Sequence, residues 1–190
     1  MEGRTGAVCC VLEKPYDLRN YHAALRTCDA LGVQHLWVVQ PEKLRAKAGR
    51  NPYAGDPEAR LLEGAVTVRR FASTAACLAA LRRRGFAVWA TDLSQSAAGL
   101  EDTLARADLS TTKVALVFGQ EAAGISPEMA EGADCRVYLE QHGFCDSFNV
   151  AVALGLCLSL TLRRRPELRR PLAPEERREA RAAMLQALPP

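Results

Sequence analysis

The sequence predicts an α/β fold, with a mostly parallel sheet and helices on both faces, for two reasons. Continuous apolar runs such as residues 7–12 and 113–118 are typical of strands that are covered on both faces. Stretches with apolar residues at helical spacing separate these runs, and this alternation is typical of a parallel sheet. The chain has 190 residues, which is enough for one domain around one core.

Composition narrows the class of protein only slightly. Hydrophobic residues make up 48% and charged residues 25%, as in ordinary globular proteins. The net charge of +3 neither requires nor excludes a nucleic-acid partner, but arginines gather in runs at residues 82–84, 163–165 and 169–170. Each run fits either contacts with RNA phosphates or solvated helix ends.

The cysteines and the hydropathy pattern predict a soluble cytoplasmic protein. The seven cysteines are odd in number and show no C-x-x-C spacing, so we expect buried thiols rather than disulfides. No basic and then apolar leader opens the chain, and the apolar run of residues 150–162 is too short to cross a bilayer.

The first strand, residues 7–12, ends before Pro15, and a helix with apolar residues at helical spacing ends at Gly32. We expect Asn20 to cap the start of this helix and Arg26 to lie two turns further along. Arg26 stands among small residues, so we expect it to be partly desolvated and to pair with an anion. That anion is either a ligand or a neighbouring carboxylate such as Asp29.

Residues 35–39 form the second expected strand, and the polar stretch 40–64, rich in proline and glycine, is interpreted as a loop. Its basic residues surround one aromatic residue, which fits RNA contacts and a solvated loop equally well. These residues are Lys43, Arg45, Lys47, Arg50, Tyr53 and Arg60. A short strand at 66–68, a helix capped by Ser73, a strand at 86–91 and a helix at 100–107 should follow.

The strand at 113–118 runs into a loop of the form Gly-Gln-Glu-Ala-Ala-Gly, and Ser126-Pro127 then starts a helix. Glycines and an acidic residue beyond the carboxyl end of a strand suggest a ligand loop, with Glu121 as its functional side chain. After a strand at 136–139, we expect Asp146 or Ser147 to cap a long apolar helix. Because that helix is apolar nearly all round, it should be buried against the sheet or a second subunit.

Several common sites are missing from the sequence. Neither G-x-G-x-x-G nor a P-loop occurs, and the histidines at 22, 35 and 142 are scattered without metal-ligand spacing, so we expect no metal. Ser147 is not in a G-x-S-x-G motif, which argues against a serine hydrolase. The charged segment at the C-terminus should form a packing or dimer helix with an apolar stripe of Ala183, Met184 and Leu188.

Three segments, NYHAALRT, LVFGQEAAGIS and GFCDSFNVAVA, together resemble the three motifs of the SpoU/TrmH family of RNA ribose 2′-O-methyltransferases. The resemblance spans about residues 7–165 and is strongest to the tRNA guanosine branch. It implies a SPOUT α/β fold whose C-terminal part forms a deep trefoil knot, and a homodimer. It divides the chain into a methyltransferase domain, 1–170, and a helical extension, 171–190.

The resemblance also implies a cofactor and a set of site residues. S-adenosyl-L-methionine would contact Thr91, Gly119, Leu139 and Phe148, the last two beside its adenine ring. Arg26 would be the catalytic arginine, Asn20, Ser147 and Asn149 would position it and the ribose, and Glu121 would orient the loops. The expected partner is RNA, either tRNA or rRNA, without DNA or a membrane.

Three features depart from the family pattern. About three extra residues separate Lys14-Pro15 from Asn20, Glu140 stands where the family has a proline, and only residues 1–6 precede the first strand. Two other functions therefore remain as alternative hypotheses. One is an RNA-binding dimer that keeps the fold without catalysis, and the other is an α/β enzyme that uses the same pocket for a small molecule.

Overall fold

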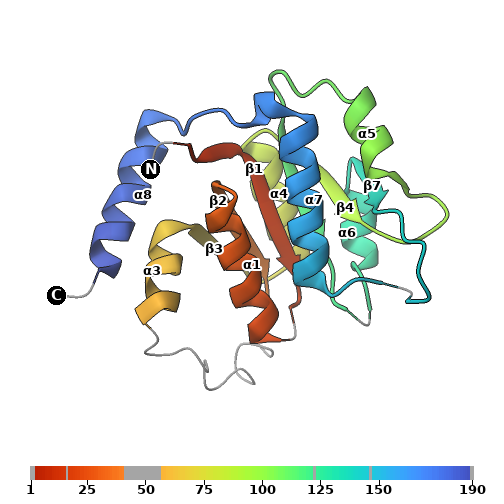
Figure 1. The fold of residues 1–190 in the computed structure, drawn as a ribbon, viewed down its shortest axis with the longest axis horizontal. Coiled ribbons are helices and arrows are strands. Elements are labelled where there is room, and N and C mark those ends of the chain that lie inside the picture. Colours follow the sequence, from red (N-terminus) through yellow and green to blue (C-terminus); the bar gives the residue numbers. More distant parts are fainter. Residues whose placement is uncertain (1–2, 16, 41–56, 122, 146, 189–190) are drawn as a thin grey trace.

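The computed structural model describes residues 3–15, 17–40, 57–121, 123–145 and 147–188. Within them, one seven-stranded sheet has the order β3-β2-β1-β6-β4-β7-β5, and every pair of neighbouring strands is parallel (Figure 1). The strands are β1 (Thr5–Glu13), β2 (Val33–Val39), β3 (Thr67–Phe71), β4 (Phe86–Thr91), β5 (Ala98–Gly99), β6 (Lys113–Phe118) and β7 (Cys135–Tyr138). The helices are α1 (Leu18–Ala30), α3 (Pro57–Ala65), α4 (Thr74–Arg83), α5 (Leu100–Arg106), α6 (Pro127–Gly132), α7 (Val150–Arg164), the 3-10 turn η1 (Pro166–Leu168) and α8 (Pro174–Ala187).

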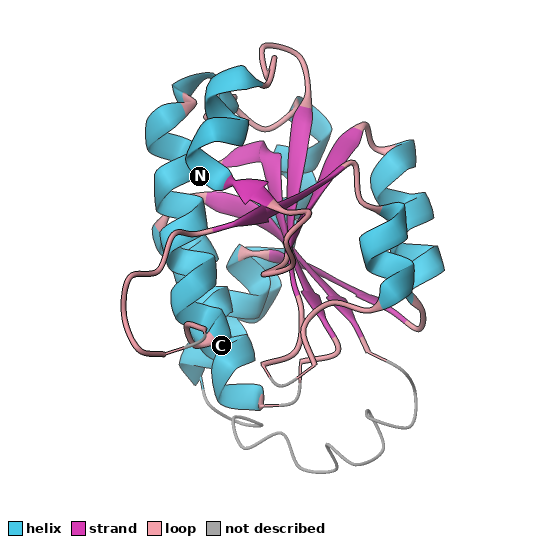
Figure 2. Cartoon of the chain, turned by 90° about the vertical axis from the view of Figure 1, so that its right-hand side faces the viewer, coloured by secondary structure: helices cyan, strands magenta, loops and turns pink. Residues whose placement is uncertain are grey.

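The sheet lies between two helical layers (Figure 2). Alternate residues of β1 point to opposite faces: Cys10 and Leu12 pack with α1, α5 and α7, while Cys9 and Val11 pack with α4 and α6. Both faces of the central strands are therefore buried, which explains why their sequences are apolar throughout. This part of the sequence-based prediction is confirmed.

The prediction of a loop over residues 40–64 is wrong at its end, because residues 57–65 form α3. Here Arg60 donates to the Gln186 carbonyl at 3.3 Å and so tethers α3 to α8. The remaining basic residues of that stretch and Tyr53 lie outside the described residues. The strand expected at 66–68 runs from Thr67 to Phe71.

The start of α7 also differs from the prediction. Asn149 is its N-cap, because the Asn149 side chain accepts from the backbone N–H groups of Ala151 and Val152. Nor is the helix buried all round: Val152 is 50% exposed and Leu156 is 44% exposed. One side of α7 packs on α1 and the sheet, and the other side presents apolar groups to solvent.

The C-terminal helix packs through different residues from those expected. Ala180 and Ala187 are buried, whereas Ala183, Met184 and Leu188 are exposed. A Cβ at Gly64 of α3 would lie 2.4 Å from the Ala187 Cβ, so the two helices approach closely through their smallest residues. Large side chains cannot fit in this contact, which leaves them on the outer surface.

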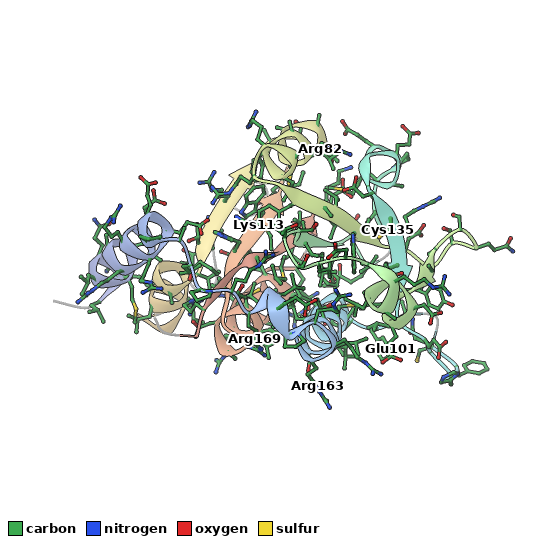
Figure 3. The ribbon with its side chains drawn as sticks, turned by 90° about the horizontal axis from the view of Figure 1, so that it is seen from above. Arg82, Glu101, Lys113, Cys135, Arg163 and Arg169 are labelled. Carbon is green, nitrogen blue, oxygen red and sulfur yellow. The ribbon has the colours of Figure 1, made fainter. Side chains whose placement is uncertain are left out.

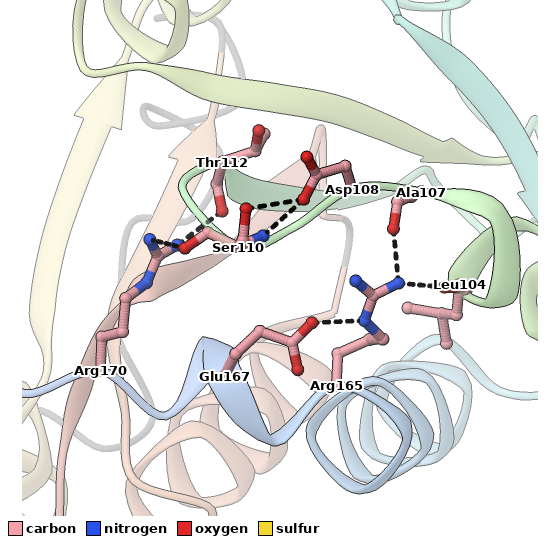
Figure 4. A network of polar contacts seen from close by, with 8 residues as sticks. All are labelled: Leu104, Ala107, Asp108, Ser110, Thr112, Arg165, Glu167 and Arg170. Atoms are coloured by element: carbon pink, nitrogen blue, oxygen red, sulfur yellow. Dashed lines mark hydrogen bonds and ion pairs between the residues drawn. The ribbon is translucent and has the colours of Figure 1, made fainter.

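Two of the arginines in the C-terminal runs fasten the chain after α7 (Figure 4). Arg165 donates to the carbonyls of Leu104 and Ala107 at 2.5 Å each and to Glu167 at 2.6 Å. Arg170 donates to the carbonyls of Ser110 and Thr112 at 3.1 and 2.6 Å.

Other members of the arginine runs differ in role. Arg164 pairs with Glu101 at 2.6 Å, and Arg84 pairs with Glu176 at 2.7 Å. Arg82 donates to the Gly132 carbonyl at 2.8 Å. Arg163 and Arg169, labelled in Figure 3, are exposed. The runs are therefore largely structural, and a few of their members remain open to solvent.

Candidate active site

A cavity of about 320 Å³ lies where β4, β6 and β7 end side by side at the carboxyl edge of the sheet. Its wall comes from the segments that follow these strands and from the start of α7. Six of the residues implied by the family resemblance line it: Thr91, Gly119, Glu121, Leu139, Ser147 and Phe148. The topology therefore gathers in one place residues that are up to 57 positions apart in the sequence.

The loop after β6 folds back on itself to form one wall of the cavity. Gln120 and Gly124 exchange two backbone hydrogen bonds, with N···O distances of 3.0 and 2.7 Å, and Gly124 has φ +65°. A Cβ at Gly119 would lie 2.1 Å from the Gly124 carbonyl carbon, so the two backbone segments touch with no room for a side chain. The glycine at 119 is thus required by close backbone approach.

The three sequence motifs meet in a chain of polar contacts. The Asn149 amide group donates to the Asn20 side-chain oxygen at 3.0 Å, and the Asn20 amide group donates to the Glu121 carboxylate. The Asn149 oxygen is already engaged at the N-terminus of α7. Each amide is therefore held in one orientation, and α1, α7 and the loop after β6 are tied together.

The remaining residues that line the cavity include both apolar and polar side chains. Leu139 is partly buried and packs against the core, and Phe148 is 41% exposed. The Thr91 hydroxyl donates to the Val117 carbonyl at 3.0 Å, which joins the ends of β4 and β6. Asp92, Gln120 and Tyr138 also line the cavity, although the sequence analysis named none of them as a site residue.

Arg26 lies apart from the cavity lining, on the exposed side of α1. In the single chain Arg26 is exposed, so the expected partial desolvation is not seen there. The adjacent Thr27 faces α7, where a Cβ at Gly155 would lie 3.5 Å from the Thr27 side chain. Asp29, considered as its partner, pairs with Arg4 at 2.6 Å.

Asn20 is not the cap of α1, because the Asp17 side chain takes that role by accepting from the Arg19 N–H group at 2.8 Å. The helix starts two residues before Asn20, so the Asn20 side chain projects from its first turn toward the loop after β6. This placement is what allows Asn20 to bridge Asn149 and Glu121.

Sequence reasoning missed Glu13, the last residue of β1. Its side chain is 1% exposed and accepts hydrogen bonds from Thr74 and Ser126. The only available signal was an acidic residue directly after an apolar strand, and surface residues show the same pattern.

Among the described residues, no group of three or more histidine, cysteine, aspartate or glutamate side chains is placed to hold a metal ion. No described helix is both long and apolar enough to span a membrane.

Comparisons with known proteins agree with the site. Residues 7–159 match the model of the SpoU rRNA Methylase family. The tRNA (guanosine(18)-2′-O)-methyltransferase of Aquifex aeolicus is 32% identical over 148 residues, which cover 78% of this chain and 65% of that enzyme. The chain thus spans about two thirds of the length of that curated relative.

Two solved structures extend the likeness to the fold. The A. aeolicus TrmH/SpoU tRNA modifying enzyme superposes with a TM-score of 0.78 and 27% identity, covering 97% of this chain and 91% of that one. The AdoMet-bound rRNA methyltransferase from Sinorhizobium meliloti gives a TM-score of 0.65 and 26% identity, covering 86% and 58%. Since the family match spans most of the chain and the contacts Asn149–Asn20–Glu121 join the three motifs beside the cavity, the protein belongs to the SpoU methylase family.

Proposed function

We propose that the protein is an S-adenosylmethionine-dependent RNA ribose 2′-O-methyltransferase. The observation that carries this proposal is the contact chain Asn149–Asn20–Glu121, which joins the three motifs at the mouth of the cavity. Proteins to which the chain is similar are named as tRNA or rRNA methyltransferases.

The cavity fits the proposed cofactor. Its volume lies at the lower end of the range for small-molecule sites, and it combines apolar walls with exposed backbone groups. Leu139 and Phe148 can flank an adenine ring, and the loop from Gly119 to Gly124 can approach a ligand through its backbone. When bound, the cofactor supplies an electrophilic methyl group on a sulfonium sulfur.

The residues of this chain would hold the RNA in line with that methyl group. A guanidinium group has five N–H donors and no acceptor, so Arg26 is suited to bind a phosphate and to stabilise negative charge on the ribose oxygen, and not to act as a base. The new C–O bond would form as the methyl–sulfur bond breaks, with the electron pair of that bond left on a neutral thioether sulfur, and the 2′-hydroxyl proton would pass to that phosphate. Asn20, Asn149 and Ser147 would position the ribose, and Glu121 would orient the loop.

A homodimer would bring Arg26 into a more enclosed site. Val152 and Leu156 are exposed four residues apart, so they form an apolar stripe along one side of α7. Arg26 lies on α1, the helix packed against α7. We infer that the stripe is covered by a second copy, with Arg26 at the edge of the interface.

Charge placed on this stripe tests the dimer. Val152→Glu with Leu156→Glu should give a monomer in light scattering, whereas Leu185→Glu, at a 60% exposed position on α8, should leave the mass unchanged. A wild-type protein that is monomeric at micromolar concentration would contradict the dimer.

We also infer the C-terminal trefoil knot. The segment between β7 and α7 runs beside the loop after β6, because Leu139 and Ser147 line the same cavity as Thr91 and Gly119. Such an arrangement is what threading of the chain end through a loop would produce. An experimental backbone trace that opens to a straight line when its two ends are pulled would exclude the knot.

The RNA substrate is proposed to be tRNA or rRNA in the cytoplasm. All seven cysteines are free, which suits a reducing compartment. The decisive experiment incubates the protein with methyl-labelled S-adenosylmethionine and separate tRNA and rRNA pools that lack ribose methylation. Label should enter one pool as an alkali-resistant dinucleotide.

Two variants make that experiment specific. Arg26→Ala should abolish labelling with cofactor binding intact, while Arg83→Ala, an exposed arginine on α4 at the opposite face of the sheet, should retain it. Near-normal turnover by Arg26→Ala would remove Arg26 from the mechanism. Cofactor binding without labelling of any RNA would favour a non-catalytic RNA-binding role.

A further inference from the structure

Glu13 is a buried carboxylate that the chemistry proposed above does not use. It is the last residue of β1 and only 1% exposed, and it lies outside the cavity lining. A buried charge is costly unless hydrogen bonds replace its hydration, so its partners indicate what it stabilises.

Its partners come from two other parts of the chain. The Thr74 hydroxyl at the start of α4 donates to Oε1 at 2.6 Å. The Ser126 hydroxyl donates to Oε1 at 2.6 Å, and the Ser126 backbone N–H group donates to Oε2 at 2.8 Å. Two of the three bonds therefore fix one residue, Ser126.

Ser126 ends the loop that forms a wall of the cavity. Its hydroxyl also accepts from the Met129 N–H group at 3.2 Å and so starts α6. The loop is held near its other end by the contact between Asn20 and Glu121. The wall formed by Gly119, Gln120 and Gly124 is thus fastened both to β1 and to α1.

The two fastening points are close together in the sequence. Lys14, directly after Glu13, has φ +53°, and its N–H group donates to the Val39 carbonyl at 2.8 Å. This turn carries the chain from β1 toward α1 and Asn20. A shift at Glu13 would therefore move the loop relative to the contact chain of the three motifs.

We propose that Glu13 is a positioning residue, which sets the cofactor-binding wall of the cavity through Ser126. The proposal rests on the proposed function, because it assigns the wall from Gly119 to Gly124 to S-adenosylmethionine. Glu13 itself touches neither cofactor nor substrate. Replacement of Glu13 should therefore lower the affinity for the cofactor, because the loop from Gly119 to Gly124 becomes less ordered.

Four variants separate positioning from general stability. Glu13→Ala and Ser126→Ala weaken the link to the loop, whereas Thr74→Ala removes a bond of similar length that leads only to α4. Glu13→Gln is the conservative rescue, because its oxygen can accept from the Ser126 N–H group while its amide donates to the hydroxyls. Calorimetric titration with S-adenosylmethionine, thermal unfolding and kinetics of labelling are measured for each.

Glu13→Ala should weaken cofactor binding by about tenfold or more, because a loosened loop must be ordered again when the cofactor binds. It should raise the KM for S-adenosylmethionine more than it lowers kcat. Ser126→Ala should show a smaller change of the same kind, and Glu13→Gln should recover most of the affinity. Thr74→Ala should lower the melting temperature yet leave affinity within about twofold.

Hydrogen exchange at the Gln120 and Gly124 amides provides a readout that does not need the cofactor, because both amides are bonded within the loop. Exchange there should be faster in Glu13→Ala than in Thr74→Ala. Wild-type protection in Glu13→Ala, or equal loss of affinity in Thr74→Ala, would overturn the positioning role. Failure of the wild-type protein to bind S-adenosylmethionine would instead overturn the proposed function.

Discussion

At the scale of single residues, the most constrained position of the site is Gly119. A methyl group there would lie 2.1 to 2.3 Å from the backbone of Gly124 and Ile125, and backbone atoms cannot move aside as a flexible side chain can. The loop would have to open, and its two hydrogen bonds between Gln120 and Gly124 would be lost.

We therefore expect Gly119→Ala to weaken S-adenosylmethionine binding by at least about tenfold, as measured by calorimetric titration, because those two bonds together are worth roughly 1–3 kcal/mol. Gly143→Ala is the matched control, since nothing lies within 4 Å of a Cβ at that position. If both variants bind S-adenosylmethionine equally well, the close backbone approach of Gly119 to Gly124 is not required for cofactor binding.

Most residues proposed for the site could be selected from the sequence, because their motifs have characteristic letters and spacing. The resemblance implied Thr91, Gly119, Leu139 and Phe148 as cofactor contacts, and all four line one cavity. Glu13 could not be found in this way. Its burial depends on Ser126, which is 113 positions away, and no local pattern records such a contact.

At the scale of elements, the start of α7 combines a helix cap with a contact to the proposed site. Asn149 caps the helix with its oxygen and donates to Asn20 with its nitrogen. The sequence suggested Asp146 or Ser147 instead, because any short polar side chain before an apolar run can serve as a cap. Only the path of the chain decides which one reaches the free N–H groups.

Substitution of Asn149 can separate its two roles. Asn149→Ala should lower the free energy of unfolding by about 1–2 kcal/mol through loss of the cap. Asn149→Ser should restore most of that stability, yet it should still reduce methyl transfer, because serine cannot bridge to Asn20 in the same way. Chemical denaturation and the labelling assay measure the two effects, and full activity in Asn149→Ser would rule out a role for the contact with Asn20.

The end of α7 has a purely structural anchor in Arg165. This side chain donates to the carbonyls of Leu104, in α5, and Ala107, directly after α5, and to Glu167 (Figure 4). Arg165→Met leaves those carbonyls without their partner, so we expect the free energy of unfolding to fall by about 1–3 kcal/mol. Urea denaturation measures this change. Arg163→Ala replaces an exposed residue and should change the free energy of unfolding by less than about 0.5 kcal/mol. A similar effect of both variants would show that the network contributes little.

Some helices and strands could be predicted from the sequence, and others could not. The central strands β1, β2, β4 and β6 could be predicted because burial on both faces makes their sequences largely apolar. The helix α3 was missed because prolines and glycines surround a short stretch of nine residues. With only two residues, β5 is too short for any periodicity.

At the scale of the whole molecule, the C-terminal helix is joined to the sheet by a small charged cluster. Glu176 of α8 lies 2.7 Å from Arg84 and 3.6 Å from the Nε2 atom of His35 in β2. His35 is 2% exposed, and neither of its ring nitrogens has a hydrogen-bond partner among the described residues. The Phe86 ring meets it edge to face.

This cluster predicts how stability depends on pH. Burial is the largest influence on His35 and lowers its pKa, although Glu176 opposes the shift. The folded state then takes up the proton less readily than the unfolded chain, whose histidine titrates near 6.5. Since stability rises with pH wherever the unfolded state binds more protons, His35 should make the protein less stable as pH falls below about 6.5.

The variant His35→Leu should flatten this part of the pH profile, because leucine binds no proton and leaves no buried nitrogen without a partner. The measurement is the midpoint of urea denaturation at pH 7.5, 6.5 and 5.5, compared between the wild type and the variant. His142→Ala, which replaces an exposed histidine, should keep the wild-type slope. If the urea midpoint of His35→Leu falls with pH as steeply as that of the wild type, the loss of stability in acid arises from other groups. The contact of α8 with the sheet then does not depend on an uncharged His35.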